Sequence, residues 1–155
     1  MTAAAYAQPK FLLSHLGTKL VNMSTDTFKV GLIASGTLAV RGTSEGYEFV
    51  SDLLANGGSA LTEVSGTGYS RLSLASVTWT LSGLAATFSA ANPTYTSPSF
   101  SFTYGWIHDE TASSATDATR PLLAIIDFGG SQAASGASYP LAVSGSGLVS
   151  FTAAA

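Results

Sequence analysis

The sequence has no cysteine, few charged residues and no long hydrophobic run, and each absence excludes a class of protein. Without cysteine there are no disulfides and no thiolate metal sites, so stability must come from packing and assembly. Charged residues make up 10% of the 155 residues, against about 25% in an average globular domain. Even the apolar run Leu122 to Ile126 falls far short of the ~20 residues that a membrane-spanning helix needs.

The few charges also argue against nucleic acid as a partner. The formal net charge is -3, whereas phosphate binding needs clustered Lys and Arg. The six basic residues are instead widely spread, at Lys10, Lys19, Lys29, Arg41, Arg71 and Arg120. Met1 to Gln8 has neither the basic segment nor the apolar segment of a secretory signal. We therefore expect a protein that contacts neither nucleic acid nor membrane.

What the sequence does contain is apolar residues and hydroxyls. The hydrophobic fraction is 46%, which is typical of a globular protein with a real core. Ser and Thr make up about a quarter of the chain and take the place of charge on the surface. Such a surface suits packing into an assembly. It is equally typical of an all-β domain with many Ser/Thr turns, and the two interpretations are compatible.

One short helix is predicted near the start of the chain. Leu12, Leu16 and Leu20 recur at helical spacing. Pro9 precedes them, in a position that suits a helix start. We therefore expect an amphipathic helix over Lys10 to Val21.

Beyond Thr25 the apolar pattern changes to the period of two that is typical of strands. The predicted strands are Phe28 to Leu32, Leu72 to Leu74, Val77 to Leu81, Leu84 to Ala90, Phe100 to Trp106, Leu122 to Phe128, Tyr139 to Val143 and Leu148 to Phe151. The third and fourth of these flank Ser82-Gly83 and predict a hairpin. Asp52 to Leu54 predicts a helical turn, and loops are predicted over Asn92 to Pro98 and Gly129 to Gly136.

Short strands at close spacing, separated by turn signals, favour a sandwich or a barrel. We predict a mainly β protein, a single antiparallel β-sandwich of jelly-roll or Ig-like type, with one short N-terminal helix. Residues 1–9 are expected to form a flexible N-terminal arm, residues 10–151 the β-sandwich domain and residues 152–155 a flexible tail. The sequence shows no internal repeat and no domain boundary.

The sequence offers no motif for catalysis or metal binding. It has no G-x-S-x-G elbow, no phosphate-binding loop with its lysine, no H-E-x-x-H and no EF-hand spacing. A hydrolase triad would need His15 or His108 beside an exposed Ser and oriented by a carboxylate. The two histidines stand far apart in the sequence. We therefore expect no catalytic, cofactor-binding or metal-binding residues.

Two acidic positions in the sequence are candidate sites. His108-Asp109-Glu110 holds three possible metal ligands, but adjacent side chains at a strand end point in alternating directions and rarely share one ion. A solvated loop edge is the favoured interpretation. Asp127 lies between two apolar residues, where a carboxylate is costly unless it is exposed or hydrogen-bonded. It either pairs with a basic partner or caps the Gly129-Gly130 turn, and the cap is favoured.

Two further patterns allow a binding role and a structural one. Gly66 and Gly68 resemble a phosphate-binding loop, but an alternating strand follows where a helix would be needed, so a tight turn is predicted. The alternating aromatic residues are Phe100, Phe102, Tyr104 and Trp106. They predict one aromatic face. That face is expected in the core, and if exposed it would provide a platform for a sugar.

Four segments occur in an order that resembles a family of small virion proteins of tailed bacteriophages. In that family a "DTDTIKVAL"-like strand, an "EVSGTGYT"-like turn, a "YAVIY-D" strand and an "LI-YIDFG" strand follow one another. The corresponding segments here are Thr25 to Ile33, Glu63 to Leu74, Tyr104 to Asp109 and Arg120 to Gly129. The resemblance covers Lys10 to Phe151, and the turn is its most specific motif. The connection Gly36 to Gly58 carries extra residues that depart from the pattern.

The resemblance implies a non-enzymatic structural protein of the virion, a capsid decoration or minor capsid protein that binds and stabilises the shell. Its partners would be the major capsid protein and further copies of itself, as a homotrimer. It would be made in the host bacterial cytoplasm and end on the capsid surface. The alternative is a carbohydrate-binding β-sandwich module of a tail or fibre, which needs exposed aromatics near polar loops. An enzyme is the third possibility.

Overall fold

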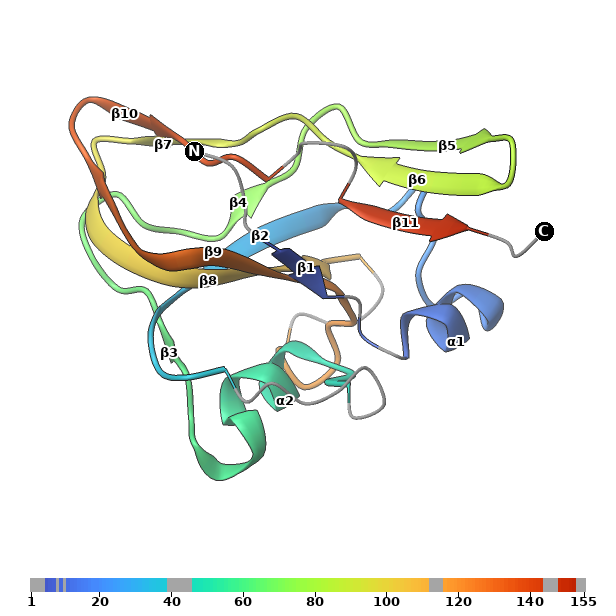
Figure 1. Ribbon diagram of the computed structural model, residues 1–155, viewed down its shortest axis with the longest axis horizontal. Coiled ribbons are helices and arrows are strands. Elements are labelled where there is room, and N and C mark those ends of the chain that lie inside the picture. Colours follow the sequence, from blue (N-terminus) through green and yellow to red (C-terminus); the bar gives the residue numbers. More distant parts are fainter. Residues whose placement is uncertain are drawn as a thin grey trace.

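The chain folds as a mainly β protein (Figure 1). The structure is a computed structural model and describes residues 5–7, 9, 11–38, 46–111, 116–143 and 148–152. Every strand pairing among these residues is antiparallel. The predicted class, a mainly β protein with antiparallel sheets, is confirmed.

The helices are short and the strands vary widely in length. The helices are α1 (Leu12–Gly17), α2 (Val50–Ala55) and the 3-10 turn η1 (Asn56–Gly58). The strands are β1 (Ala5–Ala7), β2 (Phe28–Ser35), β3 (Thr62–Glu63), β4 (Leu72–Ser73), β5 (Thr78–Ser82), β6 (Ala85–Ser89), β7 (Thr94–Thr96), β8 (Ser99–Asp109), β9 (Leu122–Ser135), β10 (Ser138–Pro140) and β11 (Val149–Thr152). The predicted hairpin is confirmed as β5 and β6, and the predicted helical turn at Asp52 belongs to α2.

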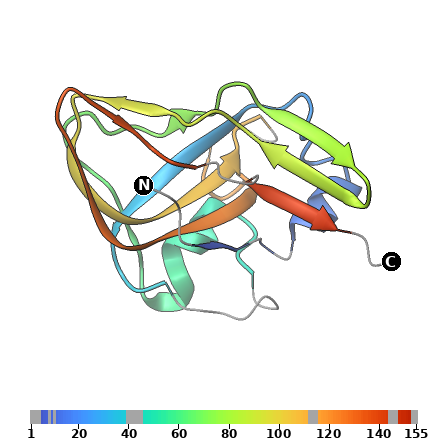
Figure 2. The ribbon, with the colours of Figure 1, turned by 45° about the horizontal axis from the view of Figure 1, so that its top comes forward.

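The strands form one large sheet and two small ones. The large sheet has the order β1-β9-β8-β2-β3, with β4 also paired to β2. The small sheets have the orders β11-β6-β5 and β10-β7. Figures 1 and 2 place both small sheets on one side of the large sheet and α2 on the other.

Both faces of the large sheet are therefore covered, and each has its own core. Strand β2 shows the division, because Phe28, Val30 and Leu32 pack toward the small sheets while Ile33 packs toward α2. The first core, between the sheets, also includes Phe88, Tyr95, Phe102, Leu123, Ile126, Leu141 and Val149. The second core consists of Ile33, Tyr47, Val50, Leu53, Leu61, Trp106, Leu122 and Ile125.

Strand β8 contributes to both cores because its pairing with β9 is interrupted by a bulge. Phe102 pairs with Gln132, but Tyr104 pairs with Asp127, so Thr103 alone opposes several residues of β9. Such a bulge bends and twists a strand. Phe100 and Phe102 therefore join the first core and Tyr104 and Trp106 the second, and the prediction of one shared aromatic face is wrong.

Two predicted loops contain strands. Residues Gly129 to Gly136 were expected to form a loop, but β9 continues through Ser135. Gly129 and Gly130 both have positive φ, so the glycines form the bulge rather than end the strand. Within Asn92 to Pro98, the short strand β7 pairs with β10.

The ends of the domain also differ from expectation. Ala5–Ala7 was predicted to be part of a flexible arm, but it forms β1 and pairs with residues 125–127 of β9 at the edge of the large sheet. Thr152 was assigned to the tail but closes β11. Helix α1 is shorter than predicted because Thr18 caps it and Lys19 has a φ of 61°. The rest of the arm and residues 153–155 lie outside the described residues, except for Pro9.

Candidate functional site

Charge is distributed unevenly over the fold. Between Arg71 and Asp109, and again after Asp127, the sequence contains no Asp, Glu, Lys or Arg. These two stretches supply β5, β6 and β11 as well as β7 and β10, and we call these five strands the uncharged layer. It lies over the first core, on the side of the molecule away from α2 (Figure 2).

Six charged side chains gather instead in one network. Arg71 donates through Nε and Nη2 to both carboxylate oxygens of Glu63, at 2.8 and 2.7 Å. It also donates to both oxygens of Asp117, at 2.6 and 2.8 Å. The guanidinium carbon lies 5.0 Å from the centre of the Trp106 ring. Arg71 is therefore held by two bidentate ion pairs and a cation–π contact.

The network extends through Arg120 to Lys29. Arg120 bonds both Asp117 and Glu110, and Glu110 accepts from Lys29 at 3.0 Å. The hydrogen bond from Arg71, reinforced by Arg120, lowers the pKa of Asp117 to about 2. Burial acts against ionisation of Glu110, but bonds from Lys29, His108 and Arg120 outweigh it and lower that pKa to about 2. We call Lys29, Glu63, Arg71, Glu110, Asp117 and Arg120 the charged network.

His108 is locked beside this network as a neutral ring. Trp106 Nε1 donates to His108 Nδ1 at 3.1 Å, so the ring proton sits on Nε2, which faces Glu110 Oε2 at 3.1 Å. Burial lowers the pKa of His108 to about 4. Both nitrogens are engaged, so neither can accept a proton from a serine nucleophile.

The 108–110 segment is not the solvated loop edge that was predicted. His108 and Asp109 are fully buried, while Asp109 Oδ1 accepts from the Thr111 N–H at 2.7 Å. His108 and Glu110 face the same side and Asp109 the other, as expected for alternating strand residues. Within the described ranges, no three His, Asp or Glu side chains lie together as metal ligands would.

The other histidine has a structural environment. His15 Nε2 lies 3.0 Å from Glu48 Oε1, and its ring stacks between the rings of Phe11 and Phe49. The side chain is buried. His15 therefore fastens α1 to the segment that leads into α2.

The two remaining sequence hypotheses are confirmed as structural features. Asp127 Oδ1 accepts from the Gly129 N–H at 2.8 Å, which is the predicted cap. The Gly66–Tyr69 segment is a tight turn, closed by a bond from the Tyr69 N–H to the Gly66 carbonyl at 3.2 Å. Gly68 has a φ of +77°, and a Cβ there would lie 2.8 Å from backbone oxygens, so only glycine fits.

Hydrogen bonds join the Gly66–Tyr69 turn to the charged network. The Tyr69 hydroxyl donates to Glu63 Oε1 at 2.8 Å and accepts from the Leu32 N–H at 3.0 Å. Glu63, Tyr69 and Arg71 thus form a hydrogen-bonded group, and the Tyr69 hydroxyl connects it to Leu32 of strand β2. Sequence analysis missed the network, although the spacing of Glu63 and Arg71 around the turn was a usable signal.

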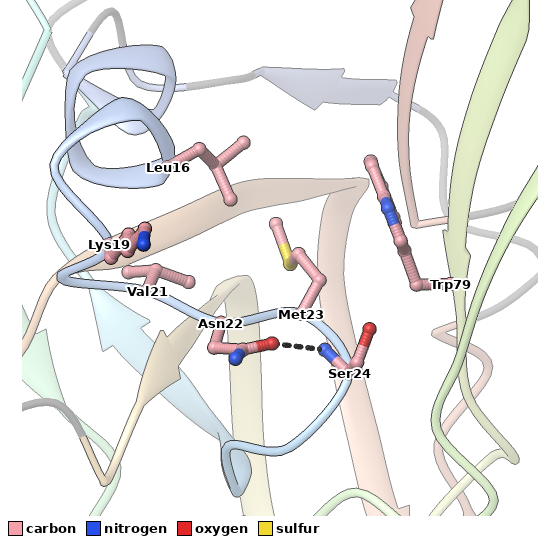
Figure 3. Close-up of a pocket in the computed structure, with 7 residues that line it drawn as sticks. All are labelled: Leu16, Lys19, Val21, Asn22, Met23, Ser24 and Trp79. Atoms are coloured by element: carbon pink, nitrogen blue, oxygen red, sulfur yellow. Dashed lines mark hydrogen bonds between the residues drawn. The ribbon is translucent and has the colours of Figure 1, made fainter.

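An open cavity with a volume of about 490 Å³ lies between α1 and the β11-β6-β5 sheet (Figure 3). Its lining residues are Leu16, Lys19, Val21, Asn22, Met23, Ser24 and Trp79. Figure 3 shows Trp79 on one side and Leu16 and Met23 on the other. No titratable group of the charged network lines the cavity. The cavity therefore offers no acid–base pair for catalysis.

Comparison with known protein families, with curated proteins and with solved structures found no match to this chain. No helix among the described residues has the length and apolar character required to cross a bilayer.

Proposed function

We propose that this chain is a non-enzymatic structural protein of a bacteriophage virion, a capsid decoration protein that binds and stabilises the shell. The observation that carries the proposal is the uncharged layer, in which five strands present a surface without a single charged side chain. The family resemblance described above supports the same role.

A surface of this kind is better suited to burial than to permanent exposure to water. Soluble domains usually carry about 25–35% charged residues on their surface. The cores of protein interfaces are depleted in charge, because burying an ion without a partner is costly. The uncharged layer can be covered by a partner with no ion to desolvate. Its Ser and Thr hydroxyls can donate or accept as the partner requires.

The layer also presents apolar anchors. Leu81 at the end of β5 is 78% exposed, and Leu84 in the following turn is 57% exposed. Both lie on the β5–β6 hairpin, which projects from the domain in Figure 1. Large apolar side chains exposed close together mark sites of contact with other proteins. The hairpin is therefore the expected centre of contact with the shell.

The charged network supports a role without turnover. Its cations and carboxylates neutralise one another, and it ties the turn after β3 to β2, β8 and the 116–120 segment. Catalytic groups are usually left poised to exchange protons in a cleft. The depressed pKa values of Glu110 and Asp117 keep both groups ionised at neutral pH.

The carbohydrate-binding alternative loses its main support. It needed the aromatic row of β8 to be exposed, but Phe102 and Trp106 are completely buried.

Shell binding suits a homotrimer, since closed symmetry leaves no propagating contact. Three copies of one weak contact also reinforce each other through effective concentration. The proposed partners are therefore the major capsid protein and two further copies of the chain.

Co-sedimentation with particles of the parent phage assembled without this protein tests the proposal. The wild-type protein should pellet with the particles, and Leu81→Asp should lose most of its binding because a buried charge replaces an anchor. Leu13→Asp is the matched control, since Leu13 is 63% exposed but lies on α1, outside the uncharged layer. Light scattering should give a trimer. A monomer that never pellets, or equal binding by both variants, would contradict the proposal.

A further inference from the structure

We propose that the cavity between α1 and β5, the Lys19 pocket, binds an apolar peptide segment that carries a carboxylate. A neighbouring subunit of the assembly supplies the segment, so the source of the ligand rests on the proposed function. The pocket is lined by residues of α1 and the segment after it, together with Trp79 of β5 (Figure 3).

The size and walls of the pocket fit an apolar side chain. Its volume of about 490 Å³ is within the range of small-ligand sites, which is roughly 300–1,000 Å³. Four of its seven lining residues are apolar, namely Leu16, Val21, Met23 and Trp79. The Trp79 ring is held by an edge contact with Phe151, with centroids 6.0 Å apart. A rigid indole opposite flexible Leu and Met side chains is a suitable environment for a Leu- or Phe-sized group.

The charge of the pocket specifies an acidic ligand. Among the described residues the cations are Lys19, Lys29, Arg71 and Arg120, and the last three are all paired within the charged network. Lys19 lines the pocket and makes no ion pair with any residue that the structure describes. An ammonium group beside apolar walls favours a ligand that is apolar at one end and carries a carboxylate at the other.

The backbone at Lys19 ends helix α1 beside the pocket. Its φ of 61° lies in the left-handed region, which is unfavourable for Lys and natural for Gly or Asn. This conformation follows directly after α1, where the Lys19 N–H bonds the Leu16 carbonyl at 3.2 Å. A left-handed residue just after a helix is a common way for the helix to end, and the Leu20 N–H closes this end by bonding the His15 carbonyl at 2.9 Å. The helix end places Lys19 at the pocket.

A peptide fits the polar groups of the pocket better than a sugar does. The neutral hydrogen-bonding side chains of the pocket are Asn22, Ser24 and the indole of Trp79, and the Asn22 carbonyl oxygen already accepts from the Ser24 N–H at 3.0 Å. A sugar presents hydroxyls on most sides and would leave several of them against apolar walls. An extended peptide needs only a few polar contacts to its backbone.

Chemical-shift titration of the ¹⁵N-labelled full chain tests the pocket without any particle. The probes are N-acetyl-leucine, its neutral amide, and methyl glucoside. N-acetyl-leucine should shift the Trp79 indole N–H and bind about fivefold more tightly than the amide, the effect of one exposed ion pair. The indole of Trp106 is completely buried and serves as the internal control, whose signal should not move.

Two variants with the same change in net charge separate Lys19 from general electrostatics. Lys19→Asn removes the cation but keeps a residue that accepts the left-handed backbone, and it should abolish the fivefold preference. Lys29→Gln removes a cation of the charged network and should retain the preference. No shift at Trp79 with N-acetyl-leucine, a preference that survives Lys19→Asn, or stronger binding of methyl glucoside would each overturn the proposal. Probe binding by a protein that never pellets with particles would preserve the pocket and refute the decoration role.

Discussion

At the scale of single residues, Gly31 of the large sheet lies against the Trp106 ring. The two residues are paired across β2 and β8, and a Cβ built on Gly31 would lie 2.3 Å from the indole. No real Cβ makes so short a contact, so the indole would have to move within the second core. The position accepts glycine alone, because the bare backbone forms the surface on which Trp106 packs.

We predict that Gly31→Ala destabilises the protein by about 2 kcal/mol, in the range of an overpacked core. Gly17→Ala is the matched control. A Cβ at Gly17, in α1, meets no atom within 4 Å, and the change should stabilise by about 0.5–1 kcal/mol. Urea unfolding measures both. Equal effects of the two substitutions would show that the indole does not lie against Gly31.

His108 gives the stability a defined pH dependence. Burial lowers its pKa from 6.5 to about 4 in the folded protein. Between these values the unfolded chain binds a proton that the folded protein does not, so stability falls as the pH falls from 6.5 to 4. The loss is on the order of 3 kcal/mol. His108→Gln removes the titrating group.

The free energy of unfolding of His108→Gln, measured by urea titration at several pH values, should be nearly flat from pH 6.5 to about 4.5. Below that, both proteins should lose stability, because Glu110 and Asp117 have pKa values of about 2 when folded and must be protonated as the pH falls toward 2. If the free energy of unfolding of the variant fell as steeply as that of the wild type between pH 6.5 and 4.5, His108 would not be a buried neutral ring.

At the scale of elements, Arg71 joins parts of the fold that are distant in sequence. Its two bidentate pairs connect the turn after β3 with the segment 116–120. Lysine has the same charge but cannot form a planar fork to two carboxylates. The charged network therefore depends on the geometry of this guanidinium rather than on its charge alone.

We predict that Arg71→Lys lowers the free energy of unfolding by about 2 kcal/mol, the loss of charge-assisted bonds in a partly buried site. Hydrogen exchange should rise at the Thr119 N–H, which bonds the carbonyl of Thr116. Lys29→Gln, at the more exposed end of the same network, should cost less than about 1 kcal/mol. If Arg71→Lys were as mild as Lys29→Gln, the bidentate geometry would have no special role.

The elements also show how much the sequence could predict. The β5–β6 hairpin, the Gly66–Tyr69 turn and the Asp127 cap were predicted because each depends on neighbouring residues. The division of the β8 aromatics between two cores was not, since it arises from the bulge opposite Thr103 in another strand. Asp117 was missed as a partner of Arg71 for the same reason, because the two residues are far apart in sequence. The strand at Ala5–Ala7 carries no apolar alternation and is defined by β9 alone.

At the scale of the whole molecule, the separation of charge makes a prediction about salt. Ionic strength weakens associations that rest on exposed charges, and the uncharged layer has none. We predict that particle binding by Lys19→Asn, which lacks the cation of the Lys19 pocket, changes by less than about twofold between 50 and 500 mM NaCl. Co-sedimentation across this range provides the measurement. A steep loss of binding with salt would place the shell contact on the charged side of the molecule instead.

The same separation has a practical consequence for chemical labelling. The lysines of the chain are Lys10, Lys19 and Lys29, and none belongs to the uncharged layer. Lys29 belongs to the charged network, so an amine-reactive dye at this position leaves the strands of the uncharged layer unmodified. A fluorophore on Lys29 should report the arrival of the protein on a particle, whereas a label on Lys19 would occupy the Lys19 pocket beside Trp79 of β5.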